Sequence, residues 1–287
     1  MTTTAAALLS GRTLRYAEVD PGGGLRRLGA ADFDVDAERA VFHDGDPAAV
    51  EAVAAALAEG LGGTEARALV VAVHPTATTS FFTPLPAGLP AEAREGQLRQ
   101  ETALLADLAD GPPVRVQAAP VRTERRPDGD REWFHVVHVG GPVHDRLARL
   151  AGALGLAAYD VADTTRAAAA AAGGPGLSLA VGAYGRHTEV AVVRDGAFLF
   201  GSYGPSTAPA DTAYFALAAL QQAGADLDAL DRLLVYGDDA TPERLGPTAE
   251  FAGATPRPLD PFARFGRRPD ADAAELAAFG PVLGASL

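Results

Sequence analysis

Three apolar runs separated by short polar turns fill residues 177–203 and predict an antiparallel meander. The runs read LSLAVGAYG, RHTEVAVVR and AFLFGSY, and Asp195-Gly196 joins the last two. An Asp-Gly pair favours a tight hairpin because such a turn requires positive φ, which glycine adopts at little cost. After the meander the pattern alternates between helical and strand-like segments. These segments are a helix at 211–223, a strand at 233–236, a helix at 243–252, an edge strand at 256–261 and a last helix at 272–283.

The first half of the chain carries a less regular copy of this plan. Alternating residues at 14–20 and 25–36 predict two strands around a glycine turn. Asp46 and Pro47 suit the N-cap and first position of a helix that ends near Gly60. The continuous apolar run at 68–73 is typical of a parallel strand that is covered on both faces. A helix at 143–154, a strand at 157–161 and a helix at 163–172 follow, and the GGPG run at 173–176 separates the two halves.

Residues 76–140 have no counterpart in the second half. They predict a strand, a helix at 91–109 and a strand pair at 114–121 and 132–139. Leu98, Leu105 and Leu108 share one face of that helix, so we expect this face to pack on the strands. The segment therefore predicts a small inserted α+β subdomain.

Composition narrows the possible functions. The chain has 287 residues and a formal net charge of −13, which disfavours nucleic acids and direct insertion into anionic membranes. It contains no Cys and no Lys, which excludes thiolate metal sites and lysine clamps on phosphate. No signal peptide or stretch of 18 uncharged apolar residues is apparent, so we expect a cytoplasmic protein.

The order of these elements resembles the actin-like ATPase fold, in which two RNase H-like βββαβα halves form an α/β protein. The similarity is strongest to the PilM-type pilus assembly proteins, which are related to FtsA and to the cytoplasmic part of GspL. It rests on several stretches in the right order: LRYAEVD, VVAVHPTATTSFFTPLP, LRQETALLADL, HVVHVGGPVHDRLARLAGALGLAAYDV, EVAVVRDGAFLF, LDRLLVYGDDA and PLDPFARF. The resemblance implies a first domain at 1–172 with its insert at about 76–140, and a second domain at 177–287. Its last helix, 272–283, is placed to pack back on the first domain.

The nucleotide motifs of that family are degenerate here. Actin-like ATPases hold phosphates and magnesium between two loops, each of which contributes an Asp and a Gly. In this chain Leu8 and Gly182 stand where the two Asp residues belong, and Ser10 and Tyr184 where the two Gly residues belong. Without metal-orienting carboxylates the chemistry of phosphoryl transfer loses its electrostatic basis. The candidate cleft residues that remain are Thr13, Gly185, Arg186, Thr188, Gly237 and Asp238.

Two sequence patterns resemble metal sites but lack the spacing that a metal site requires. Asp32, Asp34 and Asp36 resemble the start of a calcium loop, but the sixth position is Ala37 and the twelfth is His43. Solvated strand residues explain the same pattern. His74, His135, His138 and His144 could suggest a metal site, but residues three apart on a strand face opposite sides. We expect these four histidines to be partly exposed polar positions and no metal to be bound.

Two functions follow from the resemblance. In the first, the chain is a scaffold of a type IV pilus or secretion platform, without ATPase activity or cofactor. It captures the cytoplasmic tail of an inner-membrane partner in a groove of the first domain near the insert, and self-association is an additional option. In the second, the chain is a divergent ATPase or kinase that binds Mg-ATP with carboxylates such as Glu18, Asp238 and Asp239. A thermal shift with Mg-ATP separates the two.

Overall fold

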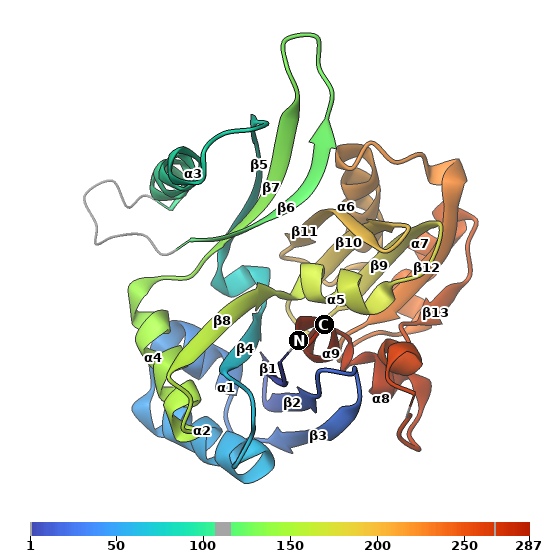
Figure 1. Ribbon diagram of the computed structural model, residues 1–287. Helices are drawn as coiled ribbons and strands as arrows, with labels where there is room; N and C mark the ends of the chain where they lie inside the picture. The colour runs from blue at the N-terminus through green and yellow to red at the C-terminus, as the bar shows by residue number, and fades with distance from the viewer. Residues whose placement is uncertain (1, 107–115, 267) are drawn as a thin grey trace.

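The computed structural model describes residues 2–106, 116–266 and 268–287. These residues form two five-stranded sheets and one three-stranded sheet (Figure 1). The strands are β1 (Thr4–Ser10), β2 (Thr13–Val19), β3 (Leu25–Asp32), β4 (Ala68–Val73), β5 (Thr79–Pro86), β6 (Gln117–Glu124), β7 (Arg131–His138), β8 (Ala158–Asp163), β9 (Leu177–Ala183), β10 (Thr188–Arg194), β11 (Ala197–Gly204), β12 (Leu230–Tyr236) and β13 (Pro256–Pro258).

Helices cover the sheets. They are α1 (Ala37–Arg39), α2 (Pro47–Leu61), α3 (Ala91–Leu105), α4 (Gly141–Ala153), α5 (Thr164–Ala172), α6 (Pro209–Gln222), α7 (Pro242–Ala252), α8 (Ala273–Ala277) and α9 (Gly280–Ala285). Short helical turns are η1 (Ala40–Asp44), η2 (Pro75–Ala77), η3 (Leu227–Ala229) and η4 (Pro261–Arg264). Among the described residues, no helix combines the length and apolar character that a membrane span requires.

The two large sheets repeat one topology. The first has the order β3-β2-β1-β4-β8 and the second the order β11-β10-β9-β12-β13. In each, three antiparallel strands form a meander, and two further strands pair in parallel beyond its first strand. β12 lies in the same sheet as β10, as the pattern at 177–236 predicts. This repeat confirms the predicted α/β class and its duplication.

Local signals explain several of these elements. Asp46 caps α2 by accepting a hydrogen bond from the backbone N–H of Ala48 at 2.9 Å, and Pro47 opens the helix. The Asp195-Gly196 turn has φ of 53° and 77°, the two positive values that a primed hairpin turn requires. Val50, Val53, Ala54, Leu57 and Leu61 of α2 recur at helical spacing along one face of the helix, and all five are buried.

Other boundaries differ from those that the sequence predicts. β1 is a strand that the sequence patterns do not single out, although it forms the centre of the first sheet. β3 ends at Asp32, because Asp36 leaves the sheet to cap α1 at the N–H of Arg39. Asp32, Asp34 and Asp36 therefore do not share one strand face.

The expected last helix is divided into α8 and α9. Pro281 lies in the first turn of α9, where it has no N–H to continue the hydrogen bonds of a preceding helix. α9 packs its Val282 and Leu283 against Leu8 of β1, in a cluster with residues from η4. The last element of the chain thus contacts the first sheet (Figure 1).

The insert is a three-stranded sheet, β5-β7-β6, with α3 on one face. Leu98 of α3 packs with Leu85, Phe134 and Val136 of the strands. The predicted role of Leu105 is wrong, because 60% of this residue is exposed. α3 instead buries Thr102, whose hydroxyl donates to the carbonyl of Leu98 at 2.7 Å. Leu108 and the beginning of the strand predicted at 114–121 lie outside the described residues.

Candidate functional site

Asp238 connects the two halves of the molecule. It follows β12 of the second sheet and accepts a hydrogen bond from the Ser10 hydroxyl, at the end of β1, at 2.5 Å. Its other carboxylate oxygen lies 2.7 Å from the guanidinium of Arg15 on β2. Each carboxylate oxygen of Asp238 therefore contacts a side chain of the first half.

Arg186 makes a second connection. It lies in the turn between β9 and β10, beside the exposed Gly185, and its Nη2 lies 2.5 Å from Oδ2 of Asp36. Two thirds of its side chain are exposed. The guanidinium that sequence analysis offers to an anion is thus paired with a carboxylate of the first half.

Three more candidate residues have structural partners. The buried Thr188 hydroxyl donates to the carbonyl of Ser206 at 3.0 Å and accepts from Arg244 Nη2 at 2.8 Å. The Thr13 hydroxyl donates to Asp32 on the neighbouring strand at 2.7 Å. Gly237 has a φ of 97°, and a Cβ there would collide with the carbonyl of Ala183. The structure brings Asp238 and Arg186 to the boundary between the halves and turns the Thr188 hydroxyl into the second half.

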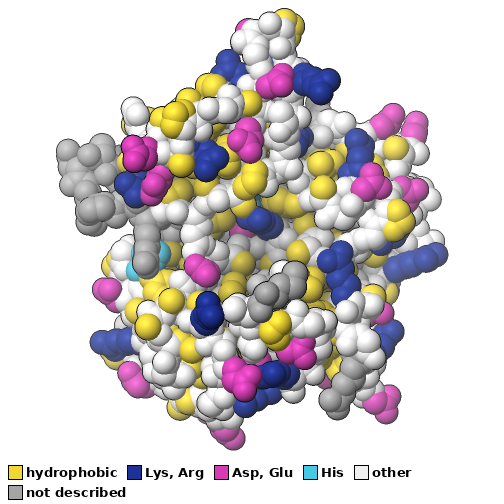
Figure 2. All heavy atoms as spheres, in the orientation of Figure 1, with side chains coloured by type: hydrophobic (Ala, Val, Ile, Leu, Met, Phe, Trp, Pro, Cys, Tyr) yellow, Lys and Arg dark blue, Asp and Glu magenta, His cyan; other side chains and the backbone are white. Residues whose placement is uncertain are grey.

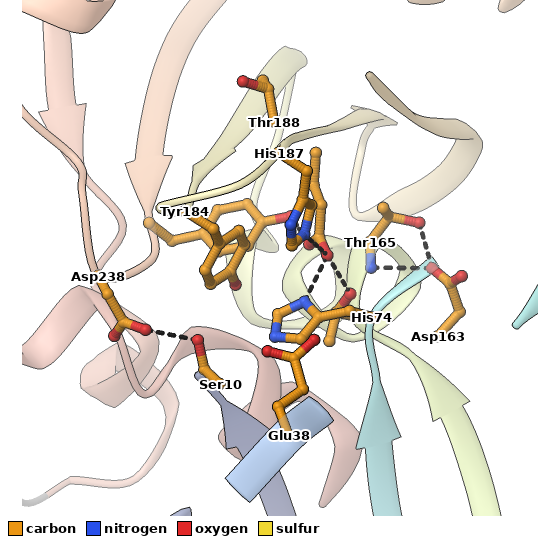
Figure 3. Close-up of polar contacts among 12 residues, drawn as sticks. Ser10, Glu38, His74, Asp163, Thr165, Tyr184, His187, Thr188 and Asp238 are labelled. Carbon is orange, nitrogen blue, oxygen red and sulfur yellow. Dashed lines mark hydrogen bonds and ion pairs between the residues drawn. The ribbon is translucent and has the colours of Figure 1, made fainter. Parts of the chain in front are cut away.

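A buried carboxylate lies at the centre of this boundary. Glu189 on β10 accepts hydrogen bonds at Oε1 from Nδ1 of His74 at 2.6 Å and from the Thr164 hydroxyl at 2.7 Å. Nε2 of His187 lies 3.2 Å from the same oxygen, and the Tyr236 hydroxyl donates to Oε2 at 3.1 Å. His74 belongs to the first half and follows β4, so this network crosses between the halves (Figure 3).

Electrostatics fix the protonation of this pair. Burial alone would lower the pKa of His74, but the carboxylates of Glu189, Glu38 and Asp238 raise the pKa of His74 to about 9. Burial opposes ionisation of Glu189 as well, yet the neighbouring His74 and His187 hold its pKa well below the usual range. Near neutral pH the network is a buried imidazolium–carboxylate pair.

Aromatic rings enclose the pair. The ring of Tyr184 stacks on His187 with centroids 4.9 Å apart and meets His74 edge-on at 4.5 Å. Burial holds the pKa values of Tyr184 and Tyr236 well above the usual range, so both hydroxyls stay protonated. The side chain of Glu38 lies near the His74 ring, on the side away from the hydrogen bond that Nδ1 makes (Figure 3). Its own carboxylate accepts from the N–H of Gly11 at 2.7 Å.

The residue types of His74, His187 and Glu189 would suit a metal ion, and their ligand atoms lie within 4.8 Å of one another. The distances between these three side chains fit hydrogen bonds better than coordination of a metal ion. Oε1 of Glu189 already has three neighbours at hydrogen-bonding distance. The 2.6 Å between Oε1 and Nδ1 of His74 is also shorter than the separation of two ligand atoms around a tetrahedral zinc ion, about 3.4 Å for bonds of about 2.1 Å. The expectation of partly exposed histidines is wrong for His74, His135 and His138, which are all buried.

Sequence reasoning missed His187 and Glu189. Their signal is the i, i+2 spacing at the start of β10, which places both side chains on one face of the sheet. Their partner His74 is 115 residues from Glu189 in sequence, and only the fold brings it there. Glu18, a candidate carboxylate for an ATPase, pairs instead with Thr64 at 2.7 Å and Arg27 at 3.1 Å.

A groove runs between the insert and the first sheet. It consists of two adjoining cavities of about 130 and 280 Å³ that share Gln117, Val137 and Val161. The first also touches His144 and Tyr159, and the second extends to α5 and α9. Figure 2 shows the surface hollowed between the insert and the lower part of the molecule, with apolar side chains along the hollow.

No protein-family model matches the sequence. No curated protein matches it by sequence either.

Several solved structures match the fold of this chain. A chain of the PilM–PilN type IV pilus biogenesis complex aligns with a TM-score of 0.66 and 15% identity over 99% of this chain and 96% of that one. A Bacteroides thetaiotaomicron protein of unknown function with an actin-like ATPase fold aligns with a TM-score of 0.52 and 11% identity over 91% of both. This chain has the actin-like ATPase fold. The cytoplasmic domain of EpsL, from the type II secretion system of Vibrio cholerae, aligns at 0.47 with 14% identity over 84% of both chains.

The predicted resemblance to PilM is thereby confirmed at the level of the fold. Within this fold the boundary between the halves is where the resemblance places phosphate and magnesium. Here the position of the first Asp is Leu8, which is buried in an apolar cluster. The position of the second is Gly182, where an added Cβ would lie 2.7 Å from the Tyr236 ring. The residues present do not fit a magnesium–phosphate group.

Proposed function

We propose that this chain is a cytoplasmic scaffold of a pilus or secretion assembly platform and that it binds the cytoplasmic tail of an inner-membrane protein. The observation that carries the proposal is the alignment with the PilM–PilN complex chain over nearly the full length of both chains. The alignment therefore includes the insert, and not only the duplicated halves that many actin-like proteins share. The neighbouring membrane partner would hold this chain at the inner membrane.

Loss of ATPase activity belongs to the same proposal. Catalysis of phosphoryl transfer requires charged groups that hold magnesium and the phosphates. At this boundary the carboxylates of Glu189, Asp238 and Asp36 each have a cationic partner within the chain. Lysine is absent from the sequence, and Arg186 is committed to Asp36. Binding of a protein tail does not depend on any of these groups.

The groove beneath the insert suits an extended peptide. β8 is the last strand of the first sheet, and within the described residues no strand pairs with its outer edge. Oε1 of Gln117 reaches that edge and accepts from the N–H of Val161 at 3.0 Å. An extended tail could pair with β8 through its backbone and place apolar side chains against Val137 and Val161.

Polar groups on the groove wall could fix the register of the tail. Nδ1 of His135 and Oδ2 of Asp163 are buried, and neither has a hydrogen-bond partner among the described residues. Both residues line the larger cavity, together with the exposed Arg166. A buried polar atom without a partner is costly, so these two atoms favour a ligand that supplies a donor and an acceptor.

The test is calorimetry with a synthetic peptide. Its sequence would be the cytoplasmic segment of the single-span membrane protein encoded beside this chain. The wild type should bind, and Val161→Glu should weaken binding about tenfold or more by placing a charge in the groove. Arg194→Ala, in an exposed hairpin outside the groove, is the matched control and should bind like the wild type. Equal binding by Val161→Glu would contradict the groove, and absence of binding by the wild type would contradict the proposed partner.

A further inference from the structure

We infer that the chain closes its own interdomain cleft: the buried His74–Glu189 pair links the halves where the resemblance to actin-like ATPases places a nucleotide, and release of the His74 proton weakens that link. The inference rests on the proposed function, because it assumes that no nucleotide occupies this boundary. It goes further in naming what replaces the nucleotide and what controls the replacement.

The position of the pair supports this role. His74 follows β4 in the first half, Glu189 lies in β10 of the second half, and both are fully buried. Thr164, at the start of α5, donates to the same carboxylate, so the helix that connects the two halves is also held. The Glu189 carboxylate therefore links β10 to the end of β4 and to the start of α5, whose relative positions would change if the cleft opened.

Two other ion pairs between the halves are more exposed than the His74–Glu189 pair. Two thirds of the Arg186 side chain lie in solvent, where water and salt screen its pairing with Asp36. The Arg15–Asp238 pair is partly buried, with about a third of the Asp238 side chain exposed. The His74–Glu189 pair has no solvent around it, so its attraction is unscreened. Of these three ion pairs between the halves, His74–Glu189 is therefore the least screened, and it adds to the apolar packing of α9 on the first sheet.

Loss of one proton would remove the positive charge of the pair. Nε2 of His74 has no hydrogen-bond partner among the described residues, so it would release the proton and Nδ1 would still donate to Glu189. The Glu189 charge would then be buried with the neutral donors Thr164 and Tyr236 and with His187. Glu38 and Asp238 also face His74 from α1 and from the end of β12, and Tyr184 packs on its ring. These carboxylates stabilise the imidazolium, so the link is ionic at neutral pH and is weakened in alkaline solution.

The absence of cysteine allows a direct measurement. Cysteines introduced for Ala55, exposed on α2, and Gln221, exposed on α6, would be the sole labelling sites for two spin labels. Pulsed electron–electron double resonance then measures the distribution of distances between the two spin labels, one on each half. We expect one narrow distribution for the wild type near pH 7, and Mg-ATP should leave it unchanged.

Two variants and a pH change test the link. His74→Gln and Glu189→Gln keep a hydrogen-bonding side chain but remove the charge, and both should lengthen or broaden the distribution. The wild type should change in the same way at about pH 10, which keeps the test decisive if a variant does not fold. His144→Gln is the matched control, because the bond of His144 to the Tyr159 hydroxyl lies within the first half. An unchanged distribution in the variants or at high pH overturns the inference and leaves the scaffold proposal intact. Narrowing by Mg-ATP overturns both.

Discussion

Gly284 of α9 faces the carbonyl oxygen of Ala167 of α5 with no space between them for a Cβ atom. This contact explains why α5 consists mostly of alanine: the two helices approach too closely for larger side chains. α9 in turn buries Val282 and Leu283 against the first sheet. The contact therefore fixes the end of the chain in the middle of the molecule.

We predict that Gly284→Ala lowers the free energy of unfolding by roughly 2–3 kcal/mol, because the helices must separate to admit the methyl group. Gly152→Ala in α4 is the control. Beyond its own helix, no atom of the described residues lies within 4 Å of its Cβ position, so the better helix propensity of alanine should stabilise the protein by about 0.5–1 kcal/mol. Urea denaturation measures both changes. Stabilisation by Gly284→Ala would show that α5 and α9 are not in this contact.

The His74 proton should make stability depend on pH. The folded chain binds it with a pKa of about 9, above the value of 6.5 for an unperturbed histidine. Its stabilisation is therefore complete below about pH 6.5 and is lost as the pH rises through about 9, with a slope of at most about 1.4 kcal/mol per pH unit. Urea denaturation between about pH 6 and 9 should show this decline in the wild type and a flatter profile in His74→Gln.

Two features make the range between pH 6.5 and 9 suitable for detecting the effect of the His74 proton on stability. The chain contains neither Cys nor Lys, so few other groups titrate between pH 6.5 and 9. The paired Glu189 has a lowered pKa, so its contribution is present above about pH 4.5 and disappears only as the pH falls through its folded value. A wild-type profile that stays level up to pH 9 would show that His74 is neutral in the folded protein.

The helix of the insert provides a comparison between two leucines. Leu98 is 5% exposed and packs on the inserted sheet, whereas Leu105 is 60% exposed. Leu98→Ala should cost about 2–5 kcal/mol of unfolding free energy, and Leu105→Ala should change it by less than about 0.5 kcal/mol. Thermal or urea denaturation gives both values. A large loss for Leu105→Ala would mean that part of the chain covers this side chain.

Local patterns in the sequence were enough to predict most of the fold. The Asp46-Pro47 cap, the Asp195-Gly196 hairpin and the apolar run of β4 each require only neighbouring residues, and each lies where the sequence predicts. Periodicity mispredicts the face of α3 because it places Leu98 and Leu105 on one side of the helix, whereas the inserted sheet covers Leu98 and not Leu105.

The candidate site was less predictable for a related reason. Arg186 and Asp238 were recognised from the family pattern, but their partners Asp36, Ser10 and Arg15 come from the other half of the chain. The same holds for His74 and Glu189, which no local spacing connects. Pairing between halves is a property of the tertiary structure, and one sequence without its fold carries no signal for it.

The last prediction concerns Mg-ATP. The wild type should show no hydrolysis and no thermal shift, because Leu8 and Gly182 stand at the positions of the two metal-orienting carboxylates. Restoring the carboxylates should not restore the activity. Leu8 is 0% exposed in an apolar cluster, so Leu8→Asp would bury a charge and destabilise the fold by several kcal/mol, about 3 or more. Gly182→Asp would collide with the ring of Tyr236.

Calorimetry and a phosphate-release assay test this expectation. They compare the wild type, Gly182→Asp and the double variant Gly182→Asp with Tyr236→Ala, in which the colliding ring is absent. If the double variant folds and still does not bind Mg-ATP, the collision with Tyr236 is not what excludes the nucleotide. If the wild type binds Mg-ATP and Arg186→Ala does not, this chain retains a phosphate site.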